Sequence, residues 1–218
     1  MTAILLTVML ISLCLALVLI GRKKSSSVLL ALFSLTSLLL FYFEPISLGS
    51  YSQVETRYVL EEFFSGNKNY REENREKIAI EVSRFVLLKA NSPSEIYMLA
   101  KRMKSLEEFR LSRLAYAALY QNNLESMDGD ILAEYSQILY FDSGRVFTDE
   151  VKESLEMALL KNSTNPIALT LKGLRFFQEG NLEGTIGEWT KALDYISDER
   201  ERNELKGVIK ALKTRKNQ

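Results

Sequence analysis

Two long uncharged apolar segments open this sequence of 218 residues and limit what its N-terminal part can fold into. Residues 1–20 contain no charged side chain, and neither do residues 25–43. A helix of about 20 apolar residues spans the hydrocarbon core of a bilayer, so each segment has the length of one crossing. The basic turn Gly21-Arg22-Lys23-Lys24 separates them, and Glu44-Pro45 ends the second with a charge and a helix breaker. The sequence therefore predicts a two-helix transmembrane anchor over residues 1–43.

The charge of the connecting turn predicts how this anchor is oriented. Short loops that carry arginine and lysine stay on the cytoplasmic side of a membrane. The turn at residues 21–24 is then cytoplasmic, and the N-terminus and the chain after residue 43 lie on the opposite side. In a bacterium, we expect a multi-pass protein of the inner (cytoplasmic) membrane whose soluble domain faces the periplasm.

Three other interpretations of the apolar segments fit their residues less well. A cleaved signal peptide needs a basic start and a small-residue cleavage motif, and the sequence has neither. A lipoprotein signal ending at Cys14 needs a small residue where Leu13 stands. A helical hairpin buried in a core would leave one face unpacked in so small a domain. We interpret Cys14 as a small apolar residue within the membrane.

The composition argues against several kinds of function. The 28 Lys and Arg residues balance 28 Asp and Glu residues, so there is no basic excess for nucleic acid. The sequence has no histidine, the commonest general base and metal ligand. Its single cysteine cannot form an intramolecular disulfide or an exchange motif. No arrangement of nucleophile and base, no metal-ligand spacing and no glycine-rich phosphate loop occurs. We therefore expect no enzyme, no cofactor and no metal site.

The chain beyond the anchor is predicted to be entirely helical. Only 10 glycines and 3 prolines interrupt a sequence rich in residues that favour helix. Within residues 44–90, helical apolar patterns lie on both sides of a break at Gly66-Asn67. We expect these two helices to form a connector between the membrane and the main domain. The charged run from Tyr70 to Lys77 is interpreted as a solvated helix face.

A helical repeat is clearest near the C-terminus. The spacing of the tetratricopeptide (TPR) signature is matched by Leu169, Gly173, Phe176, Gly180, Trp189 and Ala192. In such a repeat, Gly173 lets the two helices approach, Gly180 forms the turn, and Trp189 packs from the second helix against the first. Lys172 and Thr185 stand where leucine and alanine are usual.

Two looser repeats precede this one in the predicted domain over residues 91–218. In the nearer repeat, the turn at residues 142–145 must be about three residues longer than standard. In the other, the same offsets are occupied by Ile96, Leu99, Ala100, Met103, Ser112, Tyr116 and Leu119. A helix from Asp198 would cover the end of the stack with one side formed by Leu205, Val208, Ile209 and Leu212. We expect an all-α TPR solenoid of helical hairpins with a C-terminal capping helix.

The order of these parts resembles a known family. The resembling residues are Asp130–Tyr135, Gly144-Arg145, Ala158-Leu159, Asn165-Pro166, Gly173 and Ile186–Trp189. They are similar to the CcmI, or CycH, family of the bacterial cytochrome c maturation system. Its members have two N-terminal spans, a cytoplasmic loop and a periplasmic TPR domain. The resemblance covers nearly the whole chain and is strongest over residues 128–196, although the loop at residues 21–27 is shorter than in many members.

The resemblance implies a non-catalytic chaperone. Such a protein holds apocytochrome c, notably its C-terminal helix, and delivers it to the haem ligation complex. The implied partners are apocytochrome c, haem ligation components of the CcmF and CcmH type, and the lipid bilayer. The absence of histidine agrees with this role, because ligation chemistry then belongs to the partners. An alternative is an inner-membrane scaffold whose repeats organise another envelope complex.

The partner-binding face is expected on the first helix of each repeat, which lines the groove of a TPR stack. The helical register predicts these groove residues: Ala133, Gln137, Tyr140, Phe141, Ile167, Thr170, Leu174 and Phe177. In the first repeat it predicts Tyr97 and Lys101. For each of these residues the alternative is packing between neighbouring repeats. Trp189 lies on a second helix and is expected to pack in the core.

Overall fold

The computed structural model describes residues 52–123 and 127–216. The spans predicted within residues 1–43, the basic turn between them and Cys14 lie outside the described residues. Among the residues that are described, no helix combines the length and apolar character needed to cross a membrane. The described residues from Thr56 onward belong to one compact unit, Thr56–Gln218.

Every regular element in the described ranges is an α-helix, which confirms the all-helical prediction for this part of the chain. A helix over residues 52–65 comes first. The labelled helices follow in this order: α3 (Lys68–Leu88), α4 (Pro93–Ser105), α5 (Phe109–Asn123), α6 (Gly129–Asp142), α7 (Asp149–Lys161), α8 (Pro166–Gln178), α9 (Leu182–Leu193) and α10 (Glu199–Lys216).

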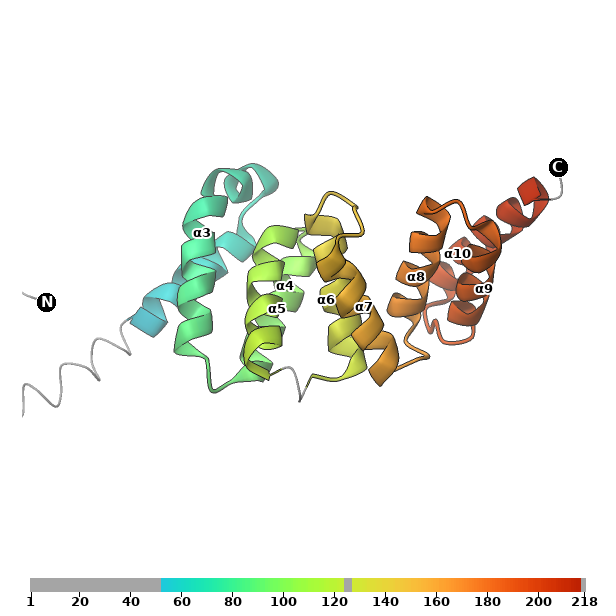
Figure 1. Ribbon diagram of the computed structural model, residues 1–218. Coiled ribbons are helices and arrows are strands. Elements are labelled where there is room, and N and C mark those ends of the chain that lie inside the picture. The colour runs from blue at the N-terminus through green and yellow to red at the C-terminus, as the bar shows by residue number, and fades with distance from the viewer. Residues whose placement is uncertain (1–51, 124–126, 217–218) are drawn as a thin grey trace, which may run out of the picture. The chain divides into compact units, whose positions relative to one another are not determined.

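Consecutive helices pair as hairpins, and each hairpin packs on the next. The pairs α4 with α5, α6 with α7, and α8 with α9 run along the unit in sequence order (Figure 1). Between pairs, α3 packs on α5, α5 on α6, and both α6 and α7 on α8. This arrangement is compatible with a helical-hairpin solenoid.

Side-chain caps explain where several helices begin. In each case the backbone N–H three residues later donates a hydrogen bond to the capping side chain; the caps are Asn67, Asp128, Thr148, Asn165 and Asn181. These bonds satisfy N–H groups that have no partner within the helix. The same short polar residues disfavour the interior of a helix, so the caps also separate neighbouring helices.

The turns inside the last two hairpins need unusual backbone angles. Gly180 has a φ of +76° between α8 and α9, a conformation that costs glycine little. Gly144 and Arg145 have φ values of +71° and +67° between α6 and α7. Residues 143–148 link α6 to α7 and residues 179–181 link α8 to α9, so the earlier connection is three residues longer, as predicted.

The interior of α4 and α5 matches the offsets read from the sequence. All seven positions assigned to the first repeat are buried: Ile96, Leu99, Ala100, Met103, Ser112, Tyr116 and Leu119. The hydroxyl of Ser112 donates to the carbonyl of Ala100 at 2.8 Å and that of Tyr116 to the carboxylate of Glu134 at 2.6 Å, so both polar groups among them are satisfied. The helical periodicity therefore identified the faces by which these two helices pack.

The helix over residues 52–65 and α3 share this core. Phe63 and Val82 are fully buried in the same cluster as the side chains of α4 to α7. Within the buried interface the hydroxyl of Thr56 donates to a carboxylate oxygen of Glu81 at 2.9 Å. These two helices, expected as a connector, thus pack as a further hairpin ahead of α4.

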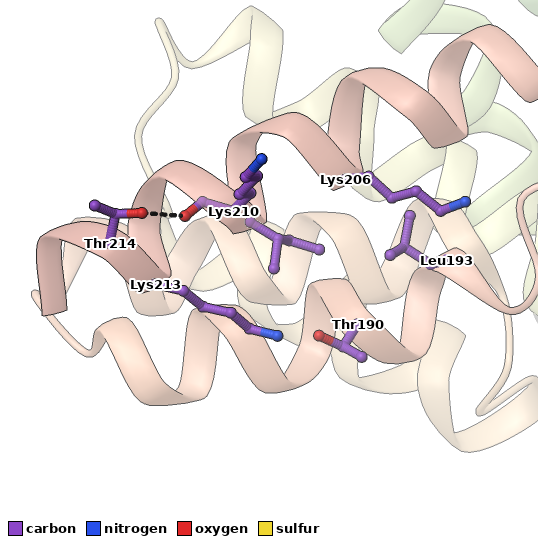
Figure 2. A pocket seen from close by; sticks show the side chains of 7 residues that line it. Thr190, Leu193, Lys206, Lys210, Lys213 and Thr214 are labelled. Atoms are coloured by element: carbon purple, nitrogen blue, oxygen red, sulfur yellow. Dashed lines mark hydrogen bonds between the residues drawn. The ribbon is translucent and has the colours of Figure 1, made fainter. Parts of the chain in front are cut away.

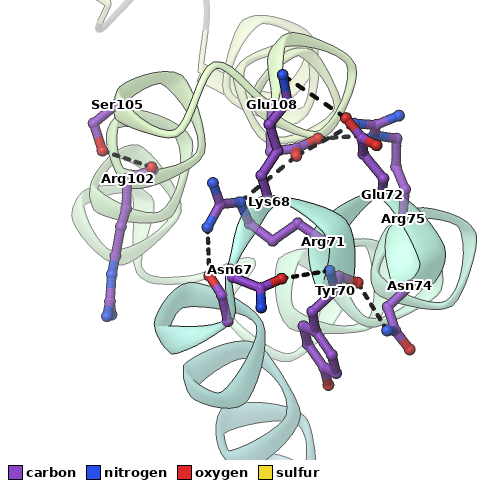
Figure 3. A network of polar contacts seen from close by, with 11 residues as sticks. Asn67, Lys68, Tyr70, Arg71, Glu72, Asn74, Arg75, Arg102, Ser105 and Glu108 are labelled. Carbon is purple, nitrogen blue, oxygen red and sulfur yellow. Dashed lines mark hydrogen bonds and ion pairs between the residues drawn. The ribbon is translucent and has the colours of Figure 1, made fainter.

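A polar network joins α3 to the start of α5 (Figure 3). The buried carboxylate of Glu108 accepts a hydrogen bond from Arg75 Nε at 2.8 Å, and Arg71 Nε lies 3.9 Å from it. Arg71 also donates to the carbonyl of Gly66 at 2.5 Å. The charged run from Tyr70 to Lys77 is therefore more than a solvated face, because two of its arginines neutralise a carboxylate in the interior.

The last helix, α10, packs on α9 as the predicted cap. Ile209 and Leu212 are buried against Trp189, and Leu205 packs at the edge of the same cluster. Val208 was expected on this side, but its side chain is 47% exposed. It follows Gly207 on the outer face, one residue out of phase with Ile209.

Candidate partner-binding groove

Trp189 holds the last hairpin together from the inside. Its side chain is only 7% exposed, and its indole Nε1 donates to the carbonyl of Thr170 at 2.9 Å. The ring passes over Gly173, where an added Cβ would lie 2.3 Å from Trp189 Cδ1. Because the indole is buried and its N–H is paired within the chain, this tryptophan packs in the core, as expected.

Two of the eight predicted groove residues belong to the interior. Ala133 is fully buried in the main core cluster. Tyr140 is buried as well: its ring lies 4.7 Å from that of Phe147, and its hydroxyl accepts a hydrogen bond from Gln178 at 2.9 Å. Both side chains are therefore part of the packed interior, and the hydroxyl of Tyr140 links α6 to the next hairpin.

Five of the predicted residues are half-buried and lie on α6 and α8, the first helices of their hairpins. They are Gln137, Phe141, Ile167, Thr170 and Leu174. The ring of Phe141 stacks on Phe109 of α5 at 4.8 Å, while Ile167 and Leu174 pack against the main cluster. Each of these five residues keeps part of its surface accessible.

Phe177 is the most accessible of the predicted set. Its side chain is 39% exposed, and its ring stacks on Trp189 with 6.3 Å between centroids. Phe177 thus presents one ring face to solvent from a fixed position on α8, as a binding residue requires.

An apolar groove lies between the helix over residues 52–65 and α4. It has a volume of about 690 Å³. Its apolar surface is formed by Leu60, Phe64, Phe85, Tyr97, Met98 and Leu99. Tyr97 and Lys101, which the register placed on the partner-binding face of the first repeat, both line it. We call this the helix-groove.

The helix-groove combines an exposed apolar surface with ion pairs at its rim. Met98 is 65% exposed within it. Arg102 makes two hydrogen bonds to Glu61, at 2.7 and 2.9 Å, and its guanidinium lies 3.8 Å above the ring of Phe64. The hydrogen bonds from Arg102 hold the pKa of Glu61 below its usual range. Such a surface accepts the apolar face of a helix and leaves charged groups for its polar edges.

A shared carboxylate fixes α4 against α5 and α6 beside the helix-groove. Glu134 accepts hydrogen bonds from the hydroxyls of Tyr116 at 2.6 Å and Tyr97 at 3.1 Å. Lys101 Nζ lies 3.7 Å from the same carboxylate, which raises the pKa of the lysine. Burial, followed by the interaction with Glu134, raises the pKa of Tyr116 and of Tyr97. These tyrosines are therefore neutral donors that orient one wall of the groove.

The residues along this face can bind a partner through apolar contacts and through charged groups at the rim. No group of three or more His, Cys, Asp or Glu side chains in the part of the chain that the structure describes is placed to hold a metal ion. The cations Arg57 and Lys101 and the carboxylates of Glu61 and Glu95 border an apolar floor. This arrangement can select the orientation of a bound amphipathic segment.

Sequence reasoning missed several residues of the helix-groove because it treated residues 44–90 as a connector. A signal was present: Arg57, Leu60, Glu61 and Phe64 follow the i, i+3, i+4, i+7 spacing of one helix face. Phe85 and Arg102 carried no comparable signal, because their place in the groove depends on how α3 and α4 pack.

Comparison with models of known protein families and with curated proteins finds no match to this chain. The arguments for its function therefore come from its own residues.

Proposed function

We propose that this chain is a membrane-anchored, non-catalytic TPR chaperone of cytochrome c maturation. In this proposal it holds apocytochrome c by its C-terminal helix and presents it to haem ligation components of the CcmF and CcmH type. The observation that carries the proposal is the helix-groove, an apolar channel with a charged rim along the first helices of a hairpin stack. The choice of cytochrome as the cargo rests on the resemblance to the CcmI family.

The TPR assignment is supported by the last hairpin. Gly173 lies under Trp189, Gly180 has the positive φ of the turn, and Asn181 caps the following helix. Each feature occupies the position that the repeat spacing gives it. The pairing of α4 with α5 and of α6 with α7 extends the same pattern.

The fit of an amphipathic helix to the helix-groove follows from its surface. A partner helix would place apolar side chains on Phe64, Phe85 and Met98 and its polar edges beside Glu61 and Lys101. Apolar contact supplies most of the affinity of helix-in-groove binding, and rim charges set the direction of the helix. Phe177 and the half-buried residues of α6 and α8 would extend the contact along the stack.

The proposed location is the bacterial inner membrane, with the hairpin stack in the periplasm. The support is the pair of uncharged segments within residues 1–43 and the basic turn between them. Membrane fractionation with protease protection in intact spheroplasts tests this part: the hairpin stack should be cleaved from outside, and protection of the stack would contradict it.

A titration of the full-length protein in nanodiscs tests the cargo. We expect saturable binding of a labelled peptide that carries the C-terminal helix of an apocytochrome c, followed by fluorescence anisotropy. Met98→Glu should weaken this binding by roughly tenfold, because it places a charge on the apolar floor. The matched control is Leu160→Glu on α7, which is 86% exposed outside the helix-groove and should leave affinity unchanged. Absence of saturable binding would overturn the chaperone proposal and favour a scaffold for another envelope complex.

Phe177→Ala tests whether the binding face extends to α8. We expect weaker peptide binding and a melting curve shifted only slightly, because this ring is partly exposed. A full cavity-sized loss of about 3 kcal/mol or more in stability would instead assign Phe177 to the core.

A further inference from the structure

A second groove, distinct from the helix-groove, lies between α9 and α10 (Figure 2). It has a volume of about 630 Å³. Leu193 and Ile209 form its apolar floor, and Lys206, Lys210 and Lys213 line it from α10. We call this the lysine groove.

Within the described residues, the three lysines of the lysine groove form no ion pair with a carboxylate. None of the residues that line the groove is acidic. On α10, the positions three and four residues from each of them also hold no Asp or Glu. By contrast, Lys172 and Lys191 in the adjoining hairpin share Glu188, each at 3.1 Å.

The cluster is a local excess of positive charge in a chain whose charges balance overall. Like charges three and four residues apart on a helix repel one another, so the cluster destabilises α10 when nothing is bound. An anionic ligand would relieve this repulsion. A local excess of one charge, next to an apolar floor, is the feature of a surface that attracts an oppositely charged partner.

We propose that the lysine groove binds an acidic amphipathic helix of a partner protein. Lys206 and Lys213 are seven residues apart, which is about 10 Å along a helix, or two turns. A partner helix with carboxylates at i, i+4 and i+7 has the same spacing on one face. Its carboxylates lie beside the three ammonium groups, and an apolar residue between them rests on Leu193 and Ile209.

The environment of α10 favours a protein ligand over an anionic membrane surface. A helix that inserts into a membrane needs an exposed apolar stripe beneath its basic residues. On α10, Ile209 and Leu212 are buried against Trp189 and are not free to insert. A recessed apolar floor accepts a protruding side chain instead. This inference does not rest on the proposed function, because the helix-groove involves neither α9 nor α10.

The test uses the full-length protein in phosphatidylcholine nanodiscs and two labelled, end-capped, alanine-based helical peptides. One carries glutamates at i, i+4 and i+7 with a leucine on the same face; the other carries glutamines at the same positions. We expect the glutamate peptide to bind roughly tenfold more tightly than the glutamine peptide. Its affinity should fall as salt is added. Equal affinity for the two peptides would overturn the proposal.

Matched variants assign the binding to the lysine groove. Combined Lys206→Gln, Lys210→Gln and Lys213→Gln should weaken glutamate-peptide binding by roughly tenfold. The control combines Lys68→Gln, Lys77→Gln and Lys152→Gln, which remove the same charge from α3 and α7 and should change affinity by less than about twofold. Equal losses in the two triple variants would overturn the proposal, because non-specific attraction would then explain the binding.

Amine labelling read by mass spectrometry separates the two kinds of ligand. We expect the glutamate peptide to protect Lys206, Lys210 and Lys213 in phosphatidylcholine nanodiscs. Protection that needs phosphatidylglycerol in the bilayer, and that the peptide does not provide, would overturn the proposal in favour of a lipid-facing surface.

Discussion

At the residue scale, the close approach of α8 and α9 depends on glycine at position 173, where a side chain would collide with Trp189. The hydrogen bond to Thr170 and the ring of Phe177 hold Trp189 over Gly173. We expect Gly173→Ala to destabilise the fold by about 1–3 kcal/mol, although alanine favours helix more than glycine does. Trp189 is the single tryptophan of the sequence, so urea unfolding followed by its fluorescence measures the effect directly.

The control for this prediction lies on the facing helix. An added Cβ at Gly187 would meet nothing within 4 Å, so Gly187→Ala should stabilise α9 by about 0.5–1 kcal/mol. Opposite signs for the two variants identify steric contact as the reason for Gly173. If both substitutions stabilise the protein, the close contact with Trp189 has no energetic consequence.

The ion pairs of Glu188 predict that the hairpin of α8 and α9 loses stability in acid. Burial raises the pKa of its carboxyl, but hydrogen bonds from Lys191 and Lys172 outweigh burial and hold the pKa below its ordinary value of 4.5. The unfolded chain therefore binds the proton first as the pH falls. The stabilisation is complete above about pH 4.5 and is lost as the pH falls through the lower native value.

Glu188→Gln checks this response. We expect it to cost about 1–2 kcal/mol at neutral pH and to flatten the dependence of stability on pH below 4.5. The measurement is the urea midpoint of Trp189 fluorescence across a pH series. An unchanged slope in the variant would assign the acid response to other carboxyls.

At the element scale, two ion pairs of different burial join the same two helices. Arg75 binds the buried Glu108 at the start of α5, while Arg110 of α5 binds the exposed Glu76 of α3. We expect Arg75→Met to cost about 1–2 kcal/mol, because the carboxylate of Glu108 then keeps only Arg71. Arg110→Met should cost less than about 0.5 kcal/mol.

Chemical denaturation of both variants, of Glu108→Gln and Glu76→Gln, and of the two corresponding double variants completes a double-mutant cycle for each pair and measures its coupling. A coupling energy for Arg75 and Glu108 no larger than that for Arg110 and Glu76 would show that burial does not strengthen the pair.

The boundaries of the elements were predictable because they depend on local chemistry. Asn67 and Asn181 cap helices where the sequence predicted breaks, and the Gly144-Arg145 turn has the extra length that the repeat spacing required. The partner of Glu108 was not predictable. Arg75 lies 33 residues away, and only the packing of α3 on α5 brings the two side chains together.

The orientation of groove residues was predictable only in part, for a related reason. A helical register gives the face of a side chain but not whether the next hairpin covers that face. Ala133 and Tyr140 are covered, whereas Phe177, on the equivalent first helix of the next hairpin, is not. The pairing of Lys172 was not predictable either. This lysine occupies a position of the repeat where leucine is usual, and only the packing of α9 on α8 brings Glu188 within 3.1 Å of it.

At the scale of the whole unit, the fully buried residues of the described core fall into three clusters, which the half-buried Leu159 and Leu174 bridge. One cluster runs from Leu60 in the first described helix through to Leu171 in α8. Two smaller clusters hold the C-terminal part together, one around Leu169 and Ala192 and one around Trp189 and Ile209. In a hairpin stack each unit is stabilised by its neighbours, so an end with its own small clusters opens more easily than the centre.

This division predicts that the unit does not unfold in a single step. The fluorescence of Trp189 reports the C-terminal clusters, whereas far-ultraviolet circular dichroism reports every helix. We expect the fluorescence midpoint to lie at lower urea concentration than the dichroism midpoint. Ile209→Ala, which opens a cavity beside Trp189, should cost about 2–4 kcal/mol locally and widen this gap. Leu132→Ala, in the centre of the main cluster, should lower the dichroism midpoint and narrow it. Coincident transitions in the wild type and both variants would mean that α8 couples the clusters so strongly that the hairpins fold as one cooperative unit.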